Sequence, residues 1–445
     1  MDDLMIARVQ MAVSLGFHIV FAAIGIAAPV FMLLAEWRWL RTGDRHALAL
    51  SKLWAKGTAI FFAVGAVSGT VLSFELGLLW PRFMEHAGGI IGAPFGLEGF
   101  AFFTEAIFLG IFLYGRDRVG KWAHLGAGAM VAISGAASAL FVIMVNGWMN
   151  APAGFDYDEA TKTFSNVDPI AAMFNQAWLP QAVHMLIAAY MATGFAAAAL
   201  HALRLLKDPT SKLHRLGLTI TMSVGTLAAL AQPLAGDWAA KVIVQRQPVK
   251  FAAMEGHFRT ETRAPLKIGG WPNEETMQTP WAINIPGGLS FLATGNFDAE
   301  VKGLEEWPRD EWPPVLVTHL SFQVMVACGT LMLGTGLWWA GAAWRRRKDG
   351  RAYPRALLWL LVVCAPLGYV AIEAGWIVTE VGRQPWIIQD VMRTAEAVTR
   401  VEGLGPRFAF FMALYVVLTA ILARILWRQV HGSPLELKGE GHDGR

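Results

Sequence analysis

Apolar residues fill most of this chain in long runs, and short polar stretches separate one run from the next. A helix that crosses a bilayer needs about 20 apolar residues, and each run reaches roughly that length. We therefore predict an all-α polytopic bundle with about nine transmembrane helices. The expected spans are residues 11–36, 54–79, 96–115, 122–146, 179–203, 216–234, 315–343, 356–380 and 407–428.

The overall composition supports a membrane protein. Hydrophobic residues make up 55% of the 445 residues, charged residues only 16%, and the mean hydropathy is +0.42. This balance lies outside the range of ordinary soluble domains. The two cysteines, Cys328 and Cys364, both fall in predicted spans, and an iron–sulfur cluster would need about four thiolates.

Basic residues collect in alternate connections, which indicates the sidedness of the bundle because short cytoplasmic loops are rich in Lys and Arg. These connections carry Arg38, Arg41, Arg45 and Lys52; Arg116, Arg118 and Lys121; Arg204, Lys207, Lys212 and Arg215; and Arg345, Arg346, Arg347, Lys348, Arg351 and Arg355. The pattern places the N-terminus outside, and the residue 431–445 tail in the cytoplasm. We expect the first run to be a retained span, because Met1 is followed by two acidic residues.

One connection, residues 235–313, is far longer than the others and lies on the predicted outer side. Loops of this length in compact proteins are usually functional or disordered. This loop carries Trp238, Trp271, Trp281, Trp307 and Trp312. Tryptophan favours the membrane interface, so we predict an ordered outer cap. The cap separates six helices in residues 1–234 from three helices in residues 314–430.

Unusual residues for a membrane helix fall toward the outer side of the predicted spans. They are His18, Glu98, Glu105, His184, Met325 and Glu380. At 1.5 Å per residue, each lies within roughly 5 to 16 Å of the outer boundary. Charge at membrane depth is costly and marks functional sites. His, Met and carboxylate can all bind haem iron, and a His/Met pair makes a six-coordinate electron-transfer haem.

Each of these residues also has a structural interpretation. A single His in a membrane helix often only makes a hydrogen bond, and a single Met often only fills the core. Glu98 and Glu105 lie seven residues apart on one helical face, which is compatible with an interfacial polar stripe or a proton relay. Glu380 and Arg383 could form a plain i,i+3 ion pair.

Lys250 and Glu255 stand among apolar residues in the long outer loop. A surface charge pair is one interpretation. The other is a site for a quinol head group, which needs hydrogen-bond partners and a proton acceptor.

Seven motifs along the chain resemble subunit I of the cytochrome bd-type quinol:oxygen oxidases. They are Arg8 with Gly16-Phe17-His18; Leu97-Glu98-Gly99 with Phe102-Phe103-Thr104-Glu105; Asn146-Gly147-Trp148; Gln181-Ala182-Val183-His184; Lys250-Phe251-Ala252-Ala253-Met254-Glu255; Phe322-Gln323-Val324-Met325; and Gly375-Trp376 through Glu380-Val381-Gly382-Arg383-Gln384-Pro385-Trp386. They span most of the chain in order. The quinol loop resembles the family's short version, with the cyanide-insensitive branch as one alternative.

The resemblance implies a role for each candidate. His184 and Met325 would ligate a low-spin haem b, while His18 and Glu380 would each ligate one haem of a high-spin pair. That pair would be a haem b with a haem d, or with a further haem b. Glu98 and Glu105 would lie near it, with Ser138 on a proton route from the cytoplasm. Arg383 would pair with haem propionates or with Glu380, and Lys250 and Glu255 would bind quinol.

The implied function is a terminal oxidase in a prokaryotic inner membrane. It would oxidise ubiquinol or menaquinol at the outer face and reduce O2 to water with cytoplasmic protons, so that a proton motive force forms without pumping. Expected partners are a second membrane subunit, subunit II, and a small accessory single-span subunit, with no nucleic acid.

Two other functions are compatible with parts of the pattern. A haem-binding electron carrier or redox sensor would use His184 and Met325 but would leave His18 and Glu380 without a role. A transporter would show broken helices and midplane sites, often in internal repeats.

Overall fold

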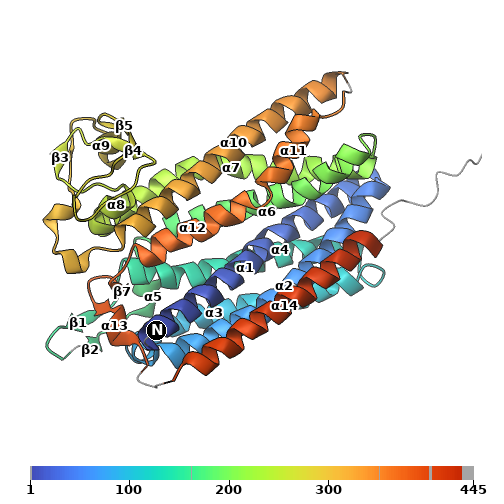
Figure 1. Ribbon diagram of the computed structural model, residues 1–445. Coiled ribbons are helices and arrows are strands. Elements are labelled where there is room, and N and C mark those ends of the chain that lie inside the picture. Colours follow the sequence, from blue (N-terminus) through green and yellow to red (C-terminus); the bar gives the residue numbers. More distant parts are fainter. Residues whose placement is uncertain (1–2, 162, 350, 400–402, 433–445) are drawn as a thin grey trace, which may run out of the picture.

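The computed structural model describes residues 3–161, 163–349, 351–399 and 403–432 (Figure 1). Within this described part, nine helical segments are long and apolar enough to cross a membrane, which confirms the predicted class. Eight are α1 (Asp3–Thr42), α2 (Arg45–Leu79), α3 (Pro81–Tyr114), α4 (Lys121–Asn150), α6 (Trp178–Lys207), α7 (Lys212–Arg246), α10 (Val315–Asp349) and α14 (Gly405–Gly432). The predicted cytoplasmic tail lies outside the described residues from residue 433 onward.

The ninth segment is a broken helix. It consists of α11 (Arg355–Cys364) and α12 (Leu367–Val381), with Pro366 between them. A proline has no backbone N–H for the helical ladder, and its ring clashes with the preceding turn, so the helix ends before it and restarts. The bend lets α12 pack against α10, α6 and α1.

The long helices form two groups that run side by side (Figure 1). The first contains α1 to α4, with α14 against α1 and α2; the second contains α6, α7, α10, α11 and α12. Contacts of α1 and α4 with α6, and of α1 with α12, join the groups. In Figure 1, α12 lies between α10 and α1. Helix α12 therefore lies at the seam between the groups, where α6 makes most of the contacts.

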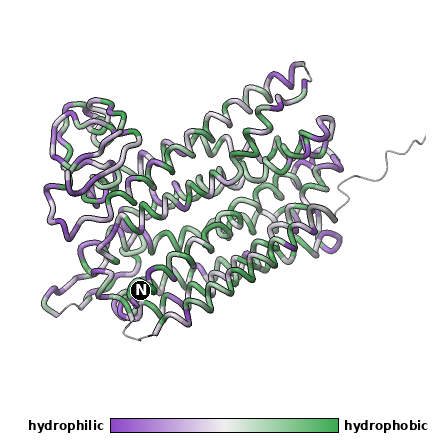
Figure 2. The backbone as a smooth tube through the Cα atoms, viewed as in Figure 1, coloured by the Kyte–Doolittle hydropathy of each residue, from purple (hydrophilic) through white to green (hydrophobic). Residues whose placement is uncertain are grey.

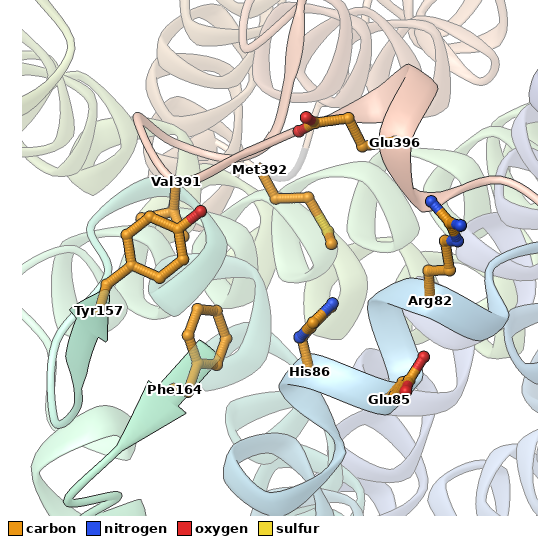
Figure 3. A pocket seen from close by; sticks show the side chains of 8 residues that line it. All are labelled: Arg82, Glu85, His86, Tyr157, Phe164, Val391, Met392 and Glu396. Atoms are coloured by element: carbon orange, nitrogen blue, oxygen red, sulfur yellow. The ribbon is translucent and has the colours of Figure 1, made fainter. Parts of the chain in front are cut away.

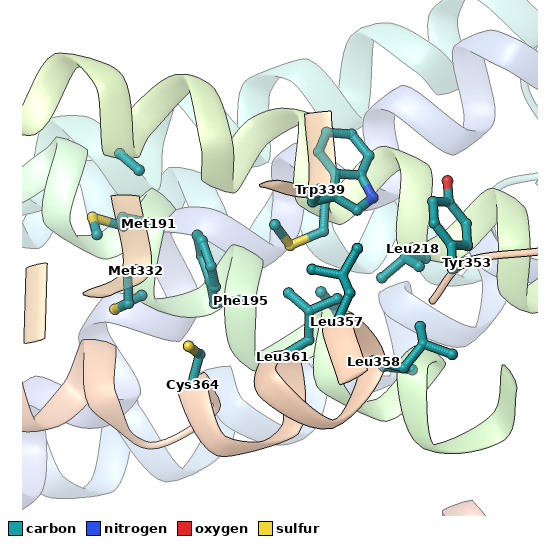
Figure 4. Close-up of a cluster of buried hydrophobic side chains, with 14 of the residues drawn as sticks. Met191, Phe195, Leu218, Met332, Trp339, Tyr353, Leu357, Leu358, Leu361 and Cys364 are labelled. Carbon is teal, nitrogen blue, oxygen red and sulfur yellow. The ribbon is translucent and has the colours of Figure 1, made fainter. Parts of the chain in front are cut away.

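Apolar side chains face both the interior and the periphery of the bundle. The largest core cluster includes Met191, Phe195, Leu218, Met332 and Leu361, from α6, α7, α10 and α11 (Figure 4). At the periphery, large apolar side chains such as Phe100 and Leu234 are exposed. Figure 2 shows hydrophobic residues along the helices and hydrophilic ones gathered at the two ends, as a bilayer requires.

The two ends of the bundle differ. The N-terminal end, where α1 begins, carries nearly all of the short elements (Figure 1). These are β1 (Asp156–Asp158), β2 (Thr163–Ser165), α5 (Pro169–Met173), β7 (Trp386–Ile388), β8 (Met392–Arg393) and α13 (Thr394–Ala397). The opposite, basic end has tight turns, such as the one before α2, where the Asp44 side chain accepts a hydrogen bond from the His46 N–H.

The long connection is an ordered cap at the N-terminal end, as its tryptophans predict. It contains α8 (Pro248–Met254), β3 (Glu261–Thr262), β4 (Leu266–Ile268), β5 (Ile283–Ile285), α9 (Gly288–Thr294), β6 (Glu300–Val301), and the short 3-10 helices η1 (Leu304–Glu306) and η2 (Arg309–Glu311). The antiparallel pairs are β3 with β6 and β4 with β5. Phe251, Met254 and Leu289 form part of the core of the cap.

The nine described helical segments extend beyond the predicted apolar runs, and α3 and α7 extend furthest at one end. The third span was expected from residue 96, but α3 begins at Pro81. The sixth was expected to end at 234, but α7 continues to Arg246. In both cases the extra turns lie at the N-terminal end of the bundle and carry Pro, Gly or charged residues. Such residues are typical of loops, but the backbone is helical there.

Candidate functional site

His18 lies on α1 and faces α2. Its Nδ1 is 2.9 Å from Ser68 Oγ. A Cβ at the next residue, Gly69, would stand only 3.0 Å from His18 Cε1, tighter than most real Cβ contacts. The imidazole therefore fits between the two helices because residue 69 has no side chain.

Glu98 and Glu105 lie on α3 and face α4. Ser138 donates a hydrogen bond to Glu98 Oε1 at 3.2 Å. The Glu105 carboxylate is buried, and its Oε2 would be 3.2 Å from a Cβ at Gly135. The third span was expected to begin at residue 96, which would put both acids in its first turns, and this is wrong. Because α3 begins at Pro81, Glu98 is near its middle and Glu105 is in its second half.

His184 and Met325 belong to the second helix group. His184, on α6, faces α7, where Gln232 Nε2 is 3.2 Å from each nitrogen of the imidazole ring. A Cβ at Gly236 of the same helix would lie 3.5 Å from His184 Cε1, which is an ordinary contact. Met325, on α10, faces α12, where a Cβ at Gly375 would be 3.1 Å from its sulfur. Each residue again lies against a glycine of a neighbouring helix. Their pairing on a single iron remains a prediction.

Glu380 stands one residue before the end of α12 and has partners on both oxygens. Arg383 Nη2 donates to Oε2 at 2.6 Å, so the expected i,i+3 ion pair is present. Asn146, near the end of α4, donates from Nδ2 to Oε1 at 2.5 Å. The carboxylate therefore joins the two helix groups.

Lys250 and Glu255 do not form a surface charge pair, because their exposed fractions are only 3% and 4%. Lys250 Nζ donates to Asn150 Oδ1 at 2.8 Å and to Gln247 Oε1 at 2.9 Å. Its stem packs on Gly382, where a Cβ would be 3.1 Å from Lys250 Cγ.

Burial changes the proton affinity of both cap residues. It lowers the pKa of the Lys250 ammonium well below its usual value, with the Arg383 guanidinium as a smaller cause in the same direction. Burial also raises the pKa of the Glu255 carboxyl to about 8, although the Lys267 ammonium opposes this change. Among the described residues, Glu255 Oε2 has no hydrogen-bond partner.

Three further carboxylates lie inside the helices, and sequence reasoning missed them. Glu36, at the basic end, accepts hydrogen bonds from Arg116 at 2.7 and 2.9 Å and from Ser51 at 2.8 Å. Glu75 is fully buried and accepts from Gln10 at 2.9 Å. Glu373 reaches α1, where a Cβ at Gly16 would be 3.1 Å from its Oε2. Their signal was visible, since each is an acid within a predicted span.

The described part of the chain includes two hollows, and Glu373 lines one of them. One of 270 Å³ opens at the N-terminal end between α3, the β1–β2 hairpin and β8 (Figure 3). Arg82, His86, Tyr157 and Glu396 are among its lining residues, and it contains none of the predicted site residues. The other, of 560 Å³, is a mostly apolar groove between α1, α10 and α12 with Glu373 on its wall.

The fold and these side chains define a polytopic membrane protein with histidine, methionine and carboxylate side chains held in fitted positions between its helices. Residues 6–434 match the family model of cytochrome bd terminal oxidase subunit I, and the chain belongs to this family. The predicted enzyme class, a quinol oxidase of the cytochrome bd type, is thereby confirmed.

The relatives are similar over nearly their whole length. A Bacillus subtilis (strain 168) protein with the provisional name cytochrome bd menaquinol oxidase subunit I is 37% identical, over 98% of this chain and 98% of its own. The Escherichia coli (strain K12) cytochrome bd-II ubiquinol oxidase subunit 1 is 28% identical, over 96% of each chain. A chain of the bd oxidase structure from Geobacillus thermodenitrificans superposes with a TM-score of 0.90 at 39% identity, over 97% of this chain and 99% of that one.

The family implies haem, and the residues present fit it. Arg383 is buried, yet its Nε and Nη1 have no hydrogen-bond partner within the described part of the chain. A buried guanidinium with two unpaired nitrogens suits a carboxylate group such as a haem propionate. The glycines beside His18 and Met325 leave these side chains space that a Cβ would occupy.

Proposed function

We propose that this chain is the haem-carrying subunit of a quinol:oxygen oxidase and that it both oxidises quinol and reduces O2 to water. The observation that carries this proposal is the shared setting of the predicted iron ligands. His18, His184 and Met325 each lie against a glycine of a neighbouring helix. Close packing on glycine admits a large or ligated side chain between helices.

The ligand roles follow the chemistry of the side chains. His184 and Met325 would hold a low-spin haem b, and His18 and Glu380 would each hold one high-spin haem. We leave open which of the two binds which ring, and whether the oxygen-binding ring is haem d or a further haem b. Bound haem supplies one-electron redox chemistry and an iron that binds O2. Arg383 would hold a propionate and keep Glu380 in place.

Quinol oxidation is assigned to the cap. Lys250 would donate a hydrogen bond to a quinol oxygen, and Glu255 would accept a proton from the other hydroxyl. Both side chains are buried, and Lys250 packs against the ends of α4 and α12, so a head group must displace present contacts to reach them. The raised pKa of Glu255, about 8, brings its proton affinity closer to that of a leaving quinol proton.

Proton delivery is assigned to α3 and α4. Ser138 donates to Glu98, and Glu105 lies deeper toward the basic end. The two acids are two turns apart on one face of α3 and can pass protons from the basic end toward His18. If the basic end is cytoplasmic, as its Lys and Arg content predicts, charge is separated across the bilayer without a pump.

The partners follow from the family. We propose a complex with subunit II, with a small accessory single-span subunit as a further component, in the inner membrane of a prokaryote. The relatives' names include both menaquinol and ubiquinol oxidases, so either quinol is a candidate substrate.

The test is to purify the complex and to measure its haem types and amounts by pyridine haemochrome analysis, the haem spin states of the intact protein by electron paramagnetic resonance, and its oxygen consumption with duroquinol and menadiol. We expect two high-spin haems, one low-spin haem and quinol-dependent oxygen uptake. A single low-spin haem without oxygen uptake would instead identify an electron carrier or redox sensor.

A further inference from the structure

A continuous hydrogen-bonded chain connects the cap to the end of α12. Lys250 Nζ donates to Asn150 Oδ1 at 2.8 Å, and Asn150 Nδ2 donates to Asn146 Oδ1 at 3.0 Å. Asn146 Nδ2 in turn donates to Glu380 Oε1 at 2.5 Å. The chain therefore runs from an amine in the cap to a carboxylate in the bundle through two amides on α4.

The direction of this chain is determined by its two ends. Lys250 is the donor in its contact with Asn150, so Asn150 turns its oxygen toward Lys250 and its NH2 group toward Asn146. An ionised carboxylate can only accept, so Asn146 must turn its NH2 group toward Glu380. Both ends require the same amide orientations. Hydrogen bonds aligned in one direction polarise and strengthen one another.

The surroundings hold the chain in place. Asn150 is 1% exposed. Its side-chain NH2 group also donates to the backbone oxygen of Asn146, one turn earlier in α4, at 2.8 Å. Gln247 Nε2 donates to Asn150 Oδ1 and to Gln389 Oε1, each at 3.0 Å. The Arg383 guanidinium completes the far end. A change in the position of Lys250 therefore acts directly on the Asn150 amide, which is buried and bonded on both sides.

We infer that Asn146 and Asn150 are positioning residues that couple the cap to Glu380, so that a quinone head group bound at Lys250 changes the hydrogen bonding of the Glu380 carboxylate. This inference rests on the proposed function, in which Lys250 binds quinol and Glu380 ligates a high-spin haem. It adds a direct structural connection between the two sites through α4, separate from the low-spin ligands on α6 and α10.

The test uses the purified, air-oxidised holoenzyme with duroquinone, which binds without supplying electrons. Saturation is set beforehand from the inhibition of duroquinol oxidation. In the unmodified complex, we expect saturating duroquinone to shift the optical and electron paramagnetic resonance signals of the ferric high-spin haems.

Substitutions of Asn150 separate its hydrogen bond with Lys250 from its hydrogen bond with Asn146. Asn150→Asp keeps an oxygen for Lys250 but cannot donate to Asn146, so the KM for duroquinol should stay within about two-fold while the duroquinone-induced shift disappears. Asn150→Ala removes both contacts, so the shift should disappear and KM should rise about ten-fold, as expected for losing one hydrogen bond to a charged group. Asn150→Gln should restore part of the shift.

The matched control is Asn175→Ala. Asn175 is also a buried asparagine at the N-terminal end, but its NH2 group donates to backbone oxygens of Met144 and Ala172. This variant should keep the shift and the KM even if it lowers stability. A full-size shift in Asn150→Asp, or no shift at saturation in the unmodified complex, would overturn the coupling. If the unmodified complex contains no haem or does not oxidise quinol, the proposed function itself is wrong.

Discussion

At the scale of single residues, several of the candidate site residues fit against a glycine of the neighbouring helix. His18, Met325 and Glu105 each stand where a Cβ on the neighbouring helix would come within 3.0 to 3.3 Å. In a lipid environment, small residues allow helices to approach and a large side chain to fit between them. The same holds for Glu373 against Gly16, so Glu373 shares the setting of the predicted functional residues.

Substituting Gly69 by Ala should disturb His18. The new Cβ would lie 3.0 Å from His18 Cε1, so the ring must rotate away from its position near Ser68. We expect an altered high-spin haem spectrum with the low-spin signal retained. Gly77→Ala on the same helix is the control, because no described atom outside its own local backbone lies within 4 Å of that Cβ. Both variants gain about 1 kcal/mol of helix propensity, so equal spectra would refute the role of Gly69.

Substituting Met325 by Leu should remove an iron ligand while keeping the packing against Gly375. The two side chains have similar volumes, and such exchanges usually cost less than about 1.5 kcal/mol. We expect the low-spin haem to become high-spin or five-coordinate and quinol-driven turnover to slow. Reduced-minus-oxidised spectra measure this directly. If the low-spin band keeps its position and intensity, Met325 is not the ligand.

At the scale of elements, the end of α12 concentrates several contacts in one turn. Glu380 bonds Asn146 of α4, Arg383 pairs with Glu380, and Gly382 receives the stem of Lys250 from α8. The break at Pro366 makes this possible, because it separates the direction of α12 from that of α11. The turn therefore links both helix groups and the cap.

Substituting Glu380 by Ala should affect this turn selectively. It removes the acid from the buried Arg383, and breaking a buried ion pair costs about 3 to 5 kcal/mol. We expect one high-spin haem to be lost or altered and oxygen consumption to stop, while the low-spin haem that we propose between α6 and α10 is retained as an internal standard. If the variant has normal haem content and normal oxygen consumption, Glu380 is not a haem ligand and only forms a structural ion pair with Arg383.

At the scale of the whole molecule, the cap closes the N-terminal end over α7 and α10 and buries Lys250 and Glu255. Burial disfavours charge, so it raises the pKa of Glu255 to about 8. The carboxyl is then mostly protonated at neutral pH. Below a pH of about 8, the ionised fraction, which can accept a proton, increases about ten-fold for each unit by which the pH increases.

The pH dependence of quinol oxidation should follow this ionisation. We expect kcat/KM for duroquinol to increase with pH and to level off above about 8, since this ratio reports ionisations of the unliganded enzyme. In Glu255→Gln this rise should be absent, and kcat/KM should be low at every pH, with haem content unchanged. A rise of the same size in the variant would assign the ionisation to another group.

The sequence alone determined the membrane class, the nine spans and the candidate residues, because hydrophobic run length and acids or histidines within apolar runs are local properties of the chain. It did not determine where α3 begins or α7 ends, since polar turns beyond the bilayer are stabilised by packing rather than by their own apolar content. It also missed Glu36, Glu75 and Glu373.

Only the tertiary structure decided which residues meet. Lys250, Asn150, Asn146 and Glu380 come from three segments far apart in the sequence, and no local pattern relates an asparagine at a helix end to a lysine 100 positions later. The i,i+3 pairing of Glu380 with Arg383 was predictable, because helix geometry alone brings these two together. Contacts across the seam depend on how the two helix groups pack. That packing is set by the glycines, the proline break and the cap acting together, and it exists only in the folded chain.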